Sequence, residues 1–445
     1  MGDLPVVVVG AGPVGLAAAA ELAERGLVPL VLERGEHAGA TVAQWRHVRL
    51  FSRWAEVVAP AARRLLESRG WRHPDVEGYP TGGEWTDVYL RPLAEALGER
   101  VRFGVEVVGV ARRGRDRVVD AGRDSEPLTV HVRRADGGEE RITARGVIDA
   151  SGTWTSPNPL GGDGLPALGE AAAGDRIAYR VPNLDDPGDA DRYRGRHVVV
   201  AGSGHSALTA LVAFAELAER QPSTRVTWLV RRNVDAAVFG GGEADQLPAR
   251  GALGLRARAA VEAGRIAVTA EFRTAAVDRA EDGWLTLVSA NGERLEAVDE
   301  VVVLAGFRPD LSWLSELRLS LDATLQAPVA LAPLIDPNVH SCGTVYPHGA
   351  AELAHPEPGV FLAGMKSYGR APTFLAMTGY EQVRSIAAAL AGDSASAARV
   401  ELVLPETGVC SGAGVTDTPD DEHDEDGCGA PSAAEDLSLS ATFAR

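Results

Sequence analysis

The chain has 445 residues, enough for two or three domains, and 45% of them are hydrophobic, as in ordinary globular proteins. Its formal net charge of −18 disfavours a nucleic acid partner, because phosphates repel an acidic surface. No apolar run reaches membrane-spanning length, and the cysteines, 342, 410 and 428, are few and widely spaced. We therefore expect a reduced, cytoplasmic protein without a membrane partner.

Residues 6–34 have the pattern of a strand, a glycine turn, a helix and a second strand. The turn carries Gly10, Gly12 and Gly15 in GxGxxG spacing, and Pro13 opens the helix. The first glycine allows the tight turn, the second lets a pyrophosphate approach the backbone, and the third lets the helix pack on the strand. The helix N-terminus offers free N–H groups to phosphates, so the pattern predicts dinucleotide binding.

The second strand of this unit ends in Glu33, and Arg34 follows it. An acid at this place accepts hydrogen bonds from the adenosine ribose hydroxyls and repels a 2′-phosphate. The site therefore suits FAD or NAD rather than NADP.

Aromatic and basic residues alternate in the segment 45–52, WRHVRLFS. Two interpretations are open for it. In the first, Arg49 contacts flavin or substrate oxygens, and Trp45 and Phe51 form the walls of the pocket. In the second, the segment is a helix with its aromatic residues in the core and its arginines outside.

Periodicity and turn residues predict the elements that follow: helices over 60–69 and 84–97, a strand over 101–112, and a hairpin over 128–134 and 139–148. The hairpin leads into an apolar strand that ends in the small-residue turn Ser151-Gly152. Residues 153–196 are rich in Pro, Gly and Asp, and we expect them to form a linker with little regular structure.

A second nucleotide element begins at the strand 198–201. The turn after it, GSGHSA, contains Gly202, Gly204, His205 and Ser206 and leads into a helix over 207–219.

The next strand of this second element, 225–230, ends in Arg231 and Arg232. An arginine fork matches a phosphate bidentately, so we expect these arginines to hold the 2′-phosphate of NADPH. Solvated arginines at a strand end are the alternative.

The second half of the chain repeats the order of elements in the first half. A strand is predicted over 266–272 and a hairpin over 284–290 and 294–298. An apolar strand follows and leads into the turn LAGFRPD, which begins at residue 304. His340, Cys342, His348 and His355 follow in one loop, but their spacing is not that of a zinc site. We expect this loop to cover an active site and predict no metal.

A final strand, 359–364, ends at Gly364, and a helix is predicted from Thr373 to residue 390. Lys366, the only lysine of the chain, lies in the loop between them. A cation here would stabilise the negative charge of reduced flavin. The alternative is a lysine that survives by chance on the surface. Residues 411–445 are polar and acidic without periodicity, and we expect them to be disordered.

With both glycine motifs in place, residues 5–405 resemble the flavoproteins with two dinucleotide-binding domains, and are most similar to the flavin-containing (class B) monooxygenases. The turns DASG and LAGFRPD resemble the linkers of that family. The segments CGTVYPHG and GMKSYGRAPTFL resemble a bacterial group often associated with arsenic resistance.

Two features depart from the family. The monooxygenase fingerprint contains a Phe-Gly pair and a following histidine, whereas this chain has Arg176 and Tyr179 and no such histidine there. The redox cysteine pair of disulfide-reductase relatives is also missing, unless Cys342 and Cys410 meet in space.

The resemblance implies an α/β fold of two Rossmann-like three-layer domains, with the NADPH domain inserted into the FAD domain. The expected boundaries are 1–165 and 311–405 for the FAD domain, 166–310 for the NADPH domain, and 406–445 for the acidic tail.

The expected activity is NADPH-dependent FAD reduction and then oxygen transfer from O2 to a small soft nucleophile (S, N or As). There are two alternatives. One is a reductase that passes electrons to a quinone, a thiol or a protein, and the other is a non-catalytic flavin sensor. A homodimer is compatible with the sequence. The expected catalytic residues are Trp45, Arg49 and Lys366. The expected cofactor ligands are Gly10, Gly12, Pro13, Gly15, Glu33, Arg34, Trp45, Ser151, Gly152, Gly202, Gly204, His205, Ser206, Arg231, Arg232, Gly364 and Thr373.

Overall fold

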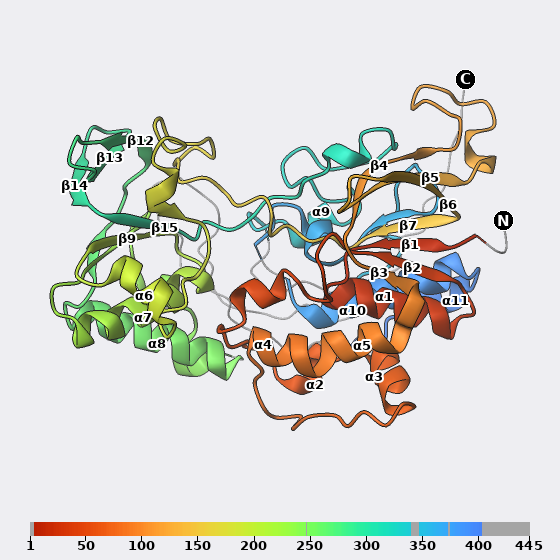
Figure 1. Cartoon of the computed structure of the whole chain (residues 1–445), viewed down its shortest axis with the longest axis horizontal. Coiled ribbons are helices and arrows are strands. Elements are labelled where there is room, and N and C mark those ends of the chain that lie inside the picture. The colour runs from red at the N-terminus through yellow and green to blue at the C-terminus, as the bar shows by residue number, and fades with distance from the viewer. Residues whose placement is uncertain (1–3, 246, 340–346, 373, 403–445) are drawn as a thin grey trace, which may run out of the picture.

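The computed structural model describes residues 4–245, 247–339, 347–372 and 374–402. These residues form two lobes, each built on a five-stranded parallel sheet (Figure 1). The first and last parts of the chain build one lobe, and the middle part builds the other. Two Rossmann-like domains, one inserted into the other, are therefore the architecture of this protein.

The sheet of the first lobe has the strand order β16-β7-β1-β2-β3. Its strands are β1 (Val6–Val9), β2 (Pro29–Leu32), β3 (Val101–Arg102), β7 (Gly146–Asp149) and β16 (Val360–Leu362). Val6 and Val8 face the helices, while Val7 and Val9 face an antiparallel sheet on the other side. Both faces of β1 are buried, which explains its uninterrupted apolar sequence. The covering sheet consists of β4 (Val105–Arg112), β5 (Leu128–Arg134) and β6 (Glu139–Ala144).

The second lobe repeats this three-layer arrangement. Its parallel sheet has the order β11-β10-β9-β15-β8, and the strands β12-β13-β14 cover one face. The strands are β8 (Ile177–Ala178), β9 (His197–Ala201), β10 (Arg225–Leu229), β11 (Ala267–Thr269), β12 (Thr274–Arg279), β13 (Leu285–Ser289), β14 (Arg294–Val298) and β15 (Glu300–Val303). Val198 and Val200 pack on helices, whereas Val199 and Ala201 pack on the covering sheet.

Most helices cover the face of each parallel sheet that lies opposite its antiparallel sheet (Figure 1). In the first lobe they are α1 (Pro13–Glu24), α2 (Trp54–Val57), α3 (Pro60–Glu67), α4 (Gly82–Trp85), α5 (Arg91–Leu97), α9 (Ala332–Ile335), α10 (Ala376–Leu390) and α11 (Ser394–Ala398). In the second lobe they are α6 (Pro187–Tyr193), α7 (His205–Arg220) and α8 (Pro248–Glu262). A π-helical stretch, 86–90, joins α4 to α5.

Two sequence expectations about local structure were wrong in part. The strand expected over 101–112 is broken at Gly104, whose φ of +66° favours glycine, so β3 and β4 belong to different sheets. The linker expected over 153–196 contains β8 and α6. Asp186 caps α6 by accepting hydrogen bonds from the backbone N–H groups of Gly188 and Asp189.

Two crossings connect the lobes and run antiparallel beside each other. The backbone N–H of Asn158 donates to the carbonyl of Gly306 at 2.9 Å, and that of Arg308 donates to Ser156 at 2.8 Å. The rings of Trp154 and Phe307 stack with centroids 5.0 Å apart. The outward and return crossings are thus fixed to each other. None of the helices in the described part of the chain has the length and apolar character needed to span a bilayer.

Candidate dinucleotide and active sites

The first glycine turn lies between β1 and α1 and leaves space in front of the backbone. Gly10 has a φ of +98°, and a Cβ there would lie 2.9 Å from the carbonyl oxygen of Ala150. A Cβ on Gly15 would lie 2.0 Å from the carbonyl oxygen of Gly10. At Gly12, in contrast, no atom lies within 4 Å of an added Cβ. Pro13 begins α1 at the helix N-terminus. The turn therefore has the shape that a dinucleotide pyrophosphate requires.

Glu33 lies directly after β2, beside the glycine turn. Its Oε2 accepts a hydrogen bond from the backbone N–H of Ala11 at 2.7 Å, and its Oε1 accepts one from Gly35 at 2.7 Å. These bonds fix the carboxylate at the edge where the ribose of a bound dinucleotide lies. Arg34 points away, with its side chain 60% exposed and 3.7 Å from Glu106.

The turn after β7 brings Ser151 and Gly152 next to the first glycine turn. A Cβ on Gly10 would approach the Cα of Ser151 to 3.0 Å. The hydroxyl of Ser151 donates to Oδ1 of Asp149 at 2.6 Å and accepts a hydrogen bond from Nζ of Lys366 at 2.9 Å. Lys366 also forms an ion pair with Asp149, 2.8 Å from Nζ to Oδ2.

Lys366 lies in the 3-10 helix Gly364–Tyr368 and is almost completely buried. Its Nζ lies 4.9 Å from the centre of the Trp313 ring. Gly364 packs against Val14 of α1, since a Cβ there would come within 3.3 Å of a Val14 methyl group. Thr373 lies outside the described residues. The sequence analysis did not predict that Asp149 pairs with Lys366. Two signals for this pair were available: Asp149 is an acid at the end of a strand, and Lys366 is the only lysine.

The second glycine turn lies between β9 and α7. Gly202 has a φ of +131°, and a Cβ there would lie 2.4 Å from the carbonyl oxygen of Leu304. Gly204 has open space in front of it. His205 and Ser206 are the first residues of α7, and both are exposed. Desolvation and the nearby guanidinium of Arg250 lower the pKa of His205.

Arg231 follows β10 and is exposed. Its Nη1 donates to the backbone carbonyl of Gly162 at 3.3 Å. Arg232 is half-buried, and its carbonyl accepts a hydrogen bond from the backbone N–H of Glu271. The strand registers match Glu33 of the first unit with Val230 of the second, so Arg231 and Arg232 lie one and two residues beyond the matching place at the same edge of the sheet.

The segment 45–52 connects the cores of the two lobes. Trp45 and Leu50 pack against the core of the first lobe, while Val48 and Phe51 pack against the core of the second. The Phe51 ring lies edge-on to His205 with centroids 5.3 Å apart. The helix expected in the second interpretation is not formed, because the 3-10 helix Val42–Trp45 ends at the start of the segment and α2 begins after it.

The other expected catalytic residues of this segment have fixed positions. The Trp45 ring packs on Gly82, where a Cβ would lie 2.6 Å from the ring. Arg49 is 62% exposed, donates to the carbonyl of Tyr79, and lies 3.9 Å from Glu84. Arg49 therefore contacts the 79–84 turn, and its contact with flavin stays a prediction.

Two histidines of the expected active-site loop are described. Nε2 of His348 lies 2.8 Å from the Gln382 amide, and Nδ1 of His355 accepts a hydrogen bond from the backbone N–H of Ser320. Burial lowers the pKa of His355 to about 4. The described residues contain no group of three or more His, Cys, Asp or Glu that could hold a metal ion. His340 and the three cysteines lie outside the described residues.

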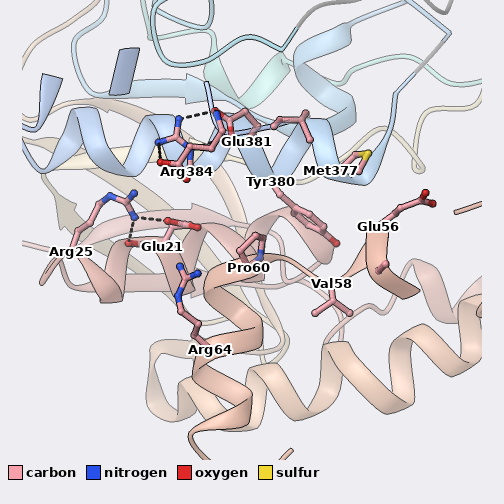
Figure 2. Close-up of a pocket in the computed structure, with 13 residues that line it drawn as sticks. Glu21, Arg25, Glu56, Val58, Pro60, Arg64, Met377, Tyr380, Glu381 and Arg384 are labelled. Atoms are coloured by element: carbon pink, nitrogen blue, oxygen red, sulfur yellow. Dashed lines mark hydrogen bonds and ion pairs between the residues drawn. The ribbon is translucent and has the colours of Figure 1, made fainter. Parts of the chain in front are cut away.

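A separate pocket of about 270 Å³ lies far along α1 from the glycine turn (Figure 2). Residues of α1, α2, α3 and α10 line it. Figure 2 shows two of its ion pairs, Arg25 with Glu21 and Arg384 with Glu381. Arg64 and Glu56 pair with Glu24 and Arg53, which lie outside the pocket. Since these charges are compensated, the pocket shows no preference for an ionic ligand.

The fold and the two glycine turns define a protein with two dinucleotide-binding domains. A family model described as pyridine nucleotide-disulphide oxidoreductase matches residues 7–332, so the chain belongs to that family. The flavoprotein-oxidoreductase class expected from the sequence is thereby confirmed.

Two relatives and one solved structure show the range of this similarity. The chain is 31% identical over 203 residues to the indole-3-pyruvate monooxygenase YUCCA1 of Oryza sativa, covering 45% of this chain and 43% of that protein. It is 27% identical to a ferredoxin–NADP reductase of Ignicoccus hospitalis, covering 71% and 81%. The FAD-bound cadaverine monooxygenase DfoA of Erwinia amylovora shares the fold, with a TM-score of 0.62, 14% identity and coverage of 91% and 98%. The chain thus spans less than half of the monooxygenase relative.

Proposed function

We propose that the protein is an NADPH-dependent FAD oxidoreductase that transfers oxygen from O2 to a small soft nucleophile. FAD binds at the first glycine turn and NADPH at the second. One observation carries this assignment: the second strand of one βαβ unit is followed by Glu33, whereas that of the other is followed by Arg231 and Arg232, one and two residues beyond the matching place. A carboxylate suits ribose hydroxyls and rejects a 2′-phosphate, whereas a guanidinium binds that phosphate.

The residues of the first site fit FAD. Gly10 and Gly15 have no room for a side chain, and Gly12 leaves the backbone accessible to a pyrophosphate. The N-terminus of α1 provides N–H groups that stabilise its charge. Glu33 is already fixed in place by two backbone N–H groups and would accept hydrogen bonds from the ribose.

The residues of the second site fit NADPH. Gly202, Gly204 and the first turn of α7 would hold its pyrophosphate, and Arg231 its 2′-phosphate. The imidazole of His205 lies beside this turn and contacts Phe51 of the other lobe. Phe51 would thereby keep water away from the place where the two cofactors meet.

A bound FAD would supply the redox chemistry, namely hydride acceptance from NADPH and electron transfer to an acceptor. The overall reaction consumes NADPH, a proton, O2 and the substrate, and yields NADP+, water and the oxygenated substrate. We propose that Trp45, Arg49 and Lys366 act on the flavin side of the site. Lys366 would act through Ser151, which it orients by a hydrogen bond. A trivalent arsenical is one soft nucleophile that this proposal includes.

A second candidate is an NADPH-dependent reductase that passes electrons to a quinone, a thiol or a protein. Two observations favour it. The ferredoxin–NADP reductase relative aligns with 71% of the chain. In addition, Arg176 and Tyr179, which stand in the fingerprint region, have structural partners: Arg176 pairs with Glu300 at 3.1 Å, and the Tyr179 hydroxyl donates to Glu170 at 2.6 Å.

Incubation of the FAD-loaded protein with NADPH and ¹⁸O2 separates these functions. The candidate substrates are a thioether, a tertiary amine and a trivalent arsenical. The mass of each product and the amount of hydrogen peroxide are measured. We expect one ¹⁸O in a product for each NADPH oxidised. NADPH oxidation that yields only peroxide, or that depends on a quinone or ferredoxin, would instead show a reductase. No NADPH oxidation under any condition would show a non-catalytic flavin protein.

A further inference from the structure

The loop that follows β3 in the first lobe returns beside the end of β2. The backbone N–H of Glu33 donates to the carbonyl of Arg102 at 2.9 Å, and the carbonyl of Glu33 accepts a hydrogen bond from the N–H of Val105 at 2.9 Å. Between these two partners lies Gly104, which has a φ of +66° and donates to the carbonyl of Gly35 at 3.0 Å. These three bonds fix the position of this loop relative to the residues that follow β2.

The second lobe repeats this loop residue by residue after β11. The N–H of Val230 donates to the carbonyl of Thr269 at 3.0 Å, and its carbonyl accepts from the N–H of Phe272 at 3.0 Å. Glu271 has a φ of +56°, in the region that favours glycine, and donates to the carbonyl of Arg232 at 3.2 Å. The bonded residues have the same spacing in both lobes, so the two loops have the same backbone arrangement.

This correspondence shows which side chains meet at the end of the second strand. Arg34 of the first lobe matches Arg231 of the second. Glu106 of the first lobe matches Arg273 of the second. In the first lobe the two side chains approach each other, with Nη1 of Arg34 3.7 Å from Oε1 of Glu106. The acid beside the first arginine is therefore replaced by a second arginine in the other lobe.

A shared contact with the outward crossing also brings Arg231 and Arg273 together. Nη1 of Arg231 donates to the carbonyl of Gly162 at 3.3 Å. A Cβ on the same Gly162 would lie 2.8 Å from the Cβ of Arg273. The N–H of Gly162 donates to the carbonyl of Thr274 at 2.9 Å, which holds the crossing in place there. Both arginines are exposed, so a ligand from solvent can reach them.

Two neighbouring guanidinium groups at this place suit a phosphate. Like charges close together repel each other, and an anion bound by both removes this repulsion. A phosphate can accept two parallel hydrogen bonds from one guanidinium and use its remaining oxygens for the other. The arginines follow β10 and β11, which are neighbours in the sheet. The adenosine ribose of a dinucleotide lies at the carboxyl end of the second strand, here β10. Val230 at the place of Glu33 carries no acid that would repel the phosphate.

We propose that Arg273 binds the 2′-phosphate of NADPH together with Arg231, so that arginines after two neighbouring strands determine the preference for NADPH over NADH. This assignment rests on the proposed function and deepens it at the second site. The first site has the opposite arrangement, because Glu106 there lies beside Arg34 and offsets its charge. The difference between the FAD site and the NADPH site thus includes a second pair of matching positions.

The test compares two fragments of the cofactor that differ only in the 2′-phosphate. The FAD-loaded protein is titrated by calorimetry with adenosine 2′,5′-bisphosphate and with adenosine 5′-monophosphate at constant ionic strength. We expect the wild type to bind the bisphosphate roughly 100-fold more tightly than the monophosphate, because two charge-assisted contacts are made. Arg273→Gln should weaken bisphosphate binding about tenfold and leave monophosphate binding unchanged. Arg273→Glu should remove the preference, because the new acid pairs with Arg231 as Glu106 pairs with Arg34.

Arg225→Gln is the matched control. Arg225 is the exposed first residue of β10, at the opposite end of the strand from Arg231, and its loss changes the net charge equally. Both affinities should stay as in the wild type. Arg273→Lys tests the proposal if Arg273→Gln does not fold. It keeps the charge without the fork, so its affinity for the bisphosphate should lie between those of the wild type and Arg231→Gln.

Three results would overturn the proposal. An unchanged preference in Arg273→Gln, together with a reduced preference in Arg231→Gln, would leave the NADPH site in place and exclude Arg273 from it. Equal weakening of both fragments in Arg273→Gln would show that this arginine only supports the structure of the site. Equal binding of both fragments by the wild type would contradict the assignment of the second site to NADPH itself.

The outcome is independent of the proposed oxygenation, because the titrations involve no turnover. A preference that depends on both arginines supports the proposal even if the ¹⁸O2 experiment yields no oxygenated product. In that case the oxygen transfer fails while the two-arginine phosphate site stands.

Discussion

The Nζ atom of Lys366 lies 2.8 Å from Oδ2 of Asp149, and both side chains are almost completely buried. This ion pair joins the turn after β7 to the loop after β16. Ser151 completes it by bonding to both partners. Because a Cβ on Gly10 would touch Ala150 and Ser151, the pair also supports the first glycine turn. The only lysine of the chain is therefore buried in an ion pair next to the proposed FAD site.

Removal of the Lys366 charge should destabilise the protein. Lys366→Met leaves Asp149 buried without a counter-charge, which typically costs about 3–5 kcal/mol. Urea unfolding followed by tryptophan fluorescence measures the loss. The double variant Lys366→Met with Asp149→Asn should recover part of it, because no charge is then buried alone. A Lys366→Met protein as stable as the wild type would show that the pair has no such role.

Replacement of Glu33 by arginine should reduce FAD occupancy. The guanidinium cannot accept hydrogen bonds from the ribose or from the backbone N–H groups of Ala11 and Gly35. The ratio of flavin absorbance to protein absorbance in purified protein gives the occupancy. Glu36→Arg, an exposed change three residues along, is the matched control. A Glu33→Arg protein that purifies with full flavin content would contradict the assignment of the first site to FAD.

Replacement of Arg231 by alanine should change the preference between NADPH and NADH. Loss of a charge-assisted hydrogen bond costs about 1.5–3 kcal/mol, so we expect the KM for NADPH to rise roughly 10- to 150-fold. The KM for NADH should change little, since NADH has no 2′-phosphate. Arg225→Ala, at the exposed first residue of β10, controls for the loss of a positive charge on the same strand. An equal rise for both cofactors would exclude specific binding of the 2′-phosphate by Arg231.

His355 should make the protein sensitive to acid. Burial lowers the pKa of this histidine to about 4 in the folded state, whereas the unfolded chain has the ordinary value near 6.5. Between these values the unfolded state binds a proton that the folded state does not, so stability falls as pH falls from about 6.5 to 4. The slope from this group is at most about 1.4 kcal/mol per pH unit.

Urea unfolding at pH 7, 6 and 5 measures this dependence. His355→Gln should weaken it, and His73→Gln in another loop should not. His47 and His197, whose pKa values are also lowered mainly by burial, contribute in the same direction, so some dependence should persist. An unchanged slope in His355→Gln would contradict the prediction.

The sequence alone predicted the two glycine units well because their signals are local. A four-residue apolar strand buried on both faces, glycines at fixed spacing and a helical pattern are all determined within about 30 residues. The break at Gly104 was missed because the whole of 101–112 favours a strand. The segment divides into β3 and β4 only because its two parts join different sheets. The helix α6 was missed because Pro and Asp, which are typical of loops, here form its capped N-terminus.

What the sequence determined by itself was thus the pair of nucleotide-binding units and the contrast between Glu33 and Arg231, since each depends on neighbours along the chain. Tertiary structure alone decided the partners that are distant in sequence. Lys366 meets Asp149 across 217 positions because β16 lies beside β7. Phe51 meets His205 and Arg308 meets Asn158 because the chain crosses twice between the lobes. Such contacts depend on which elements pack together, and no local pattern of residues encodes that choice.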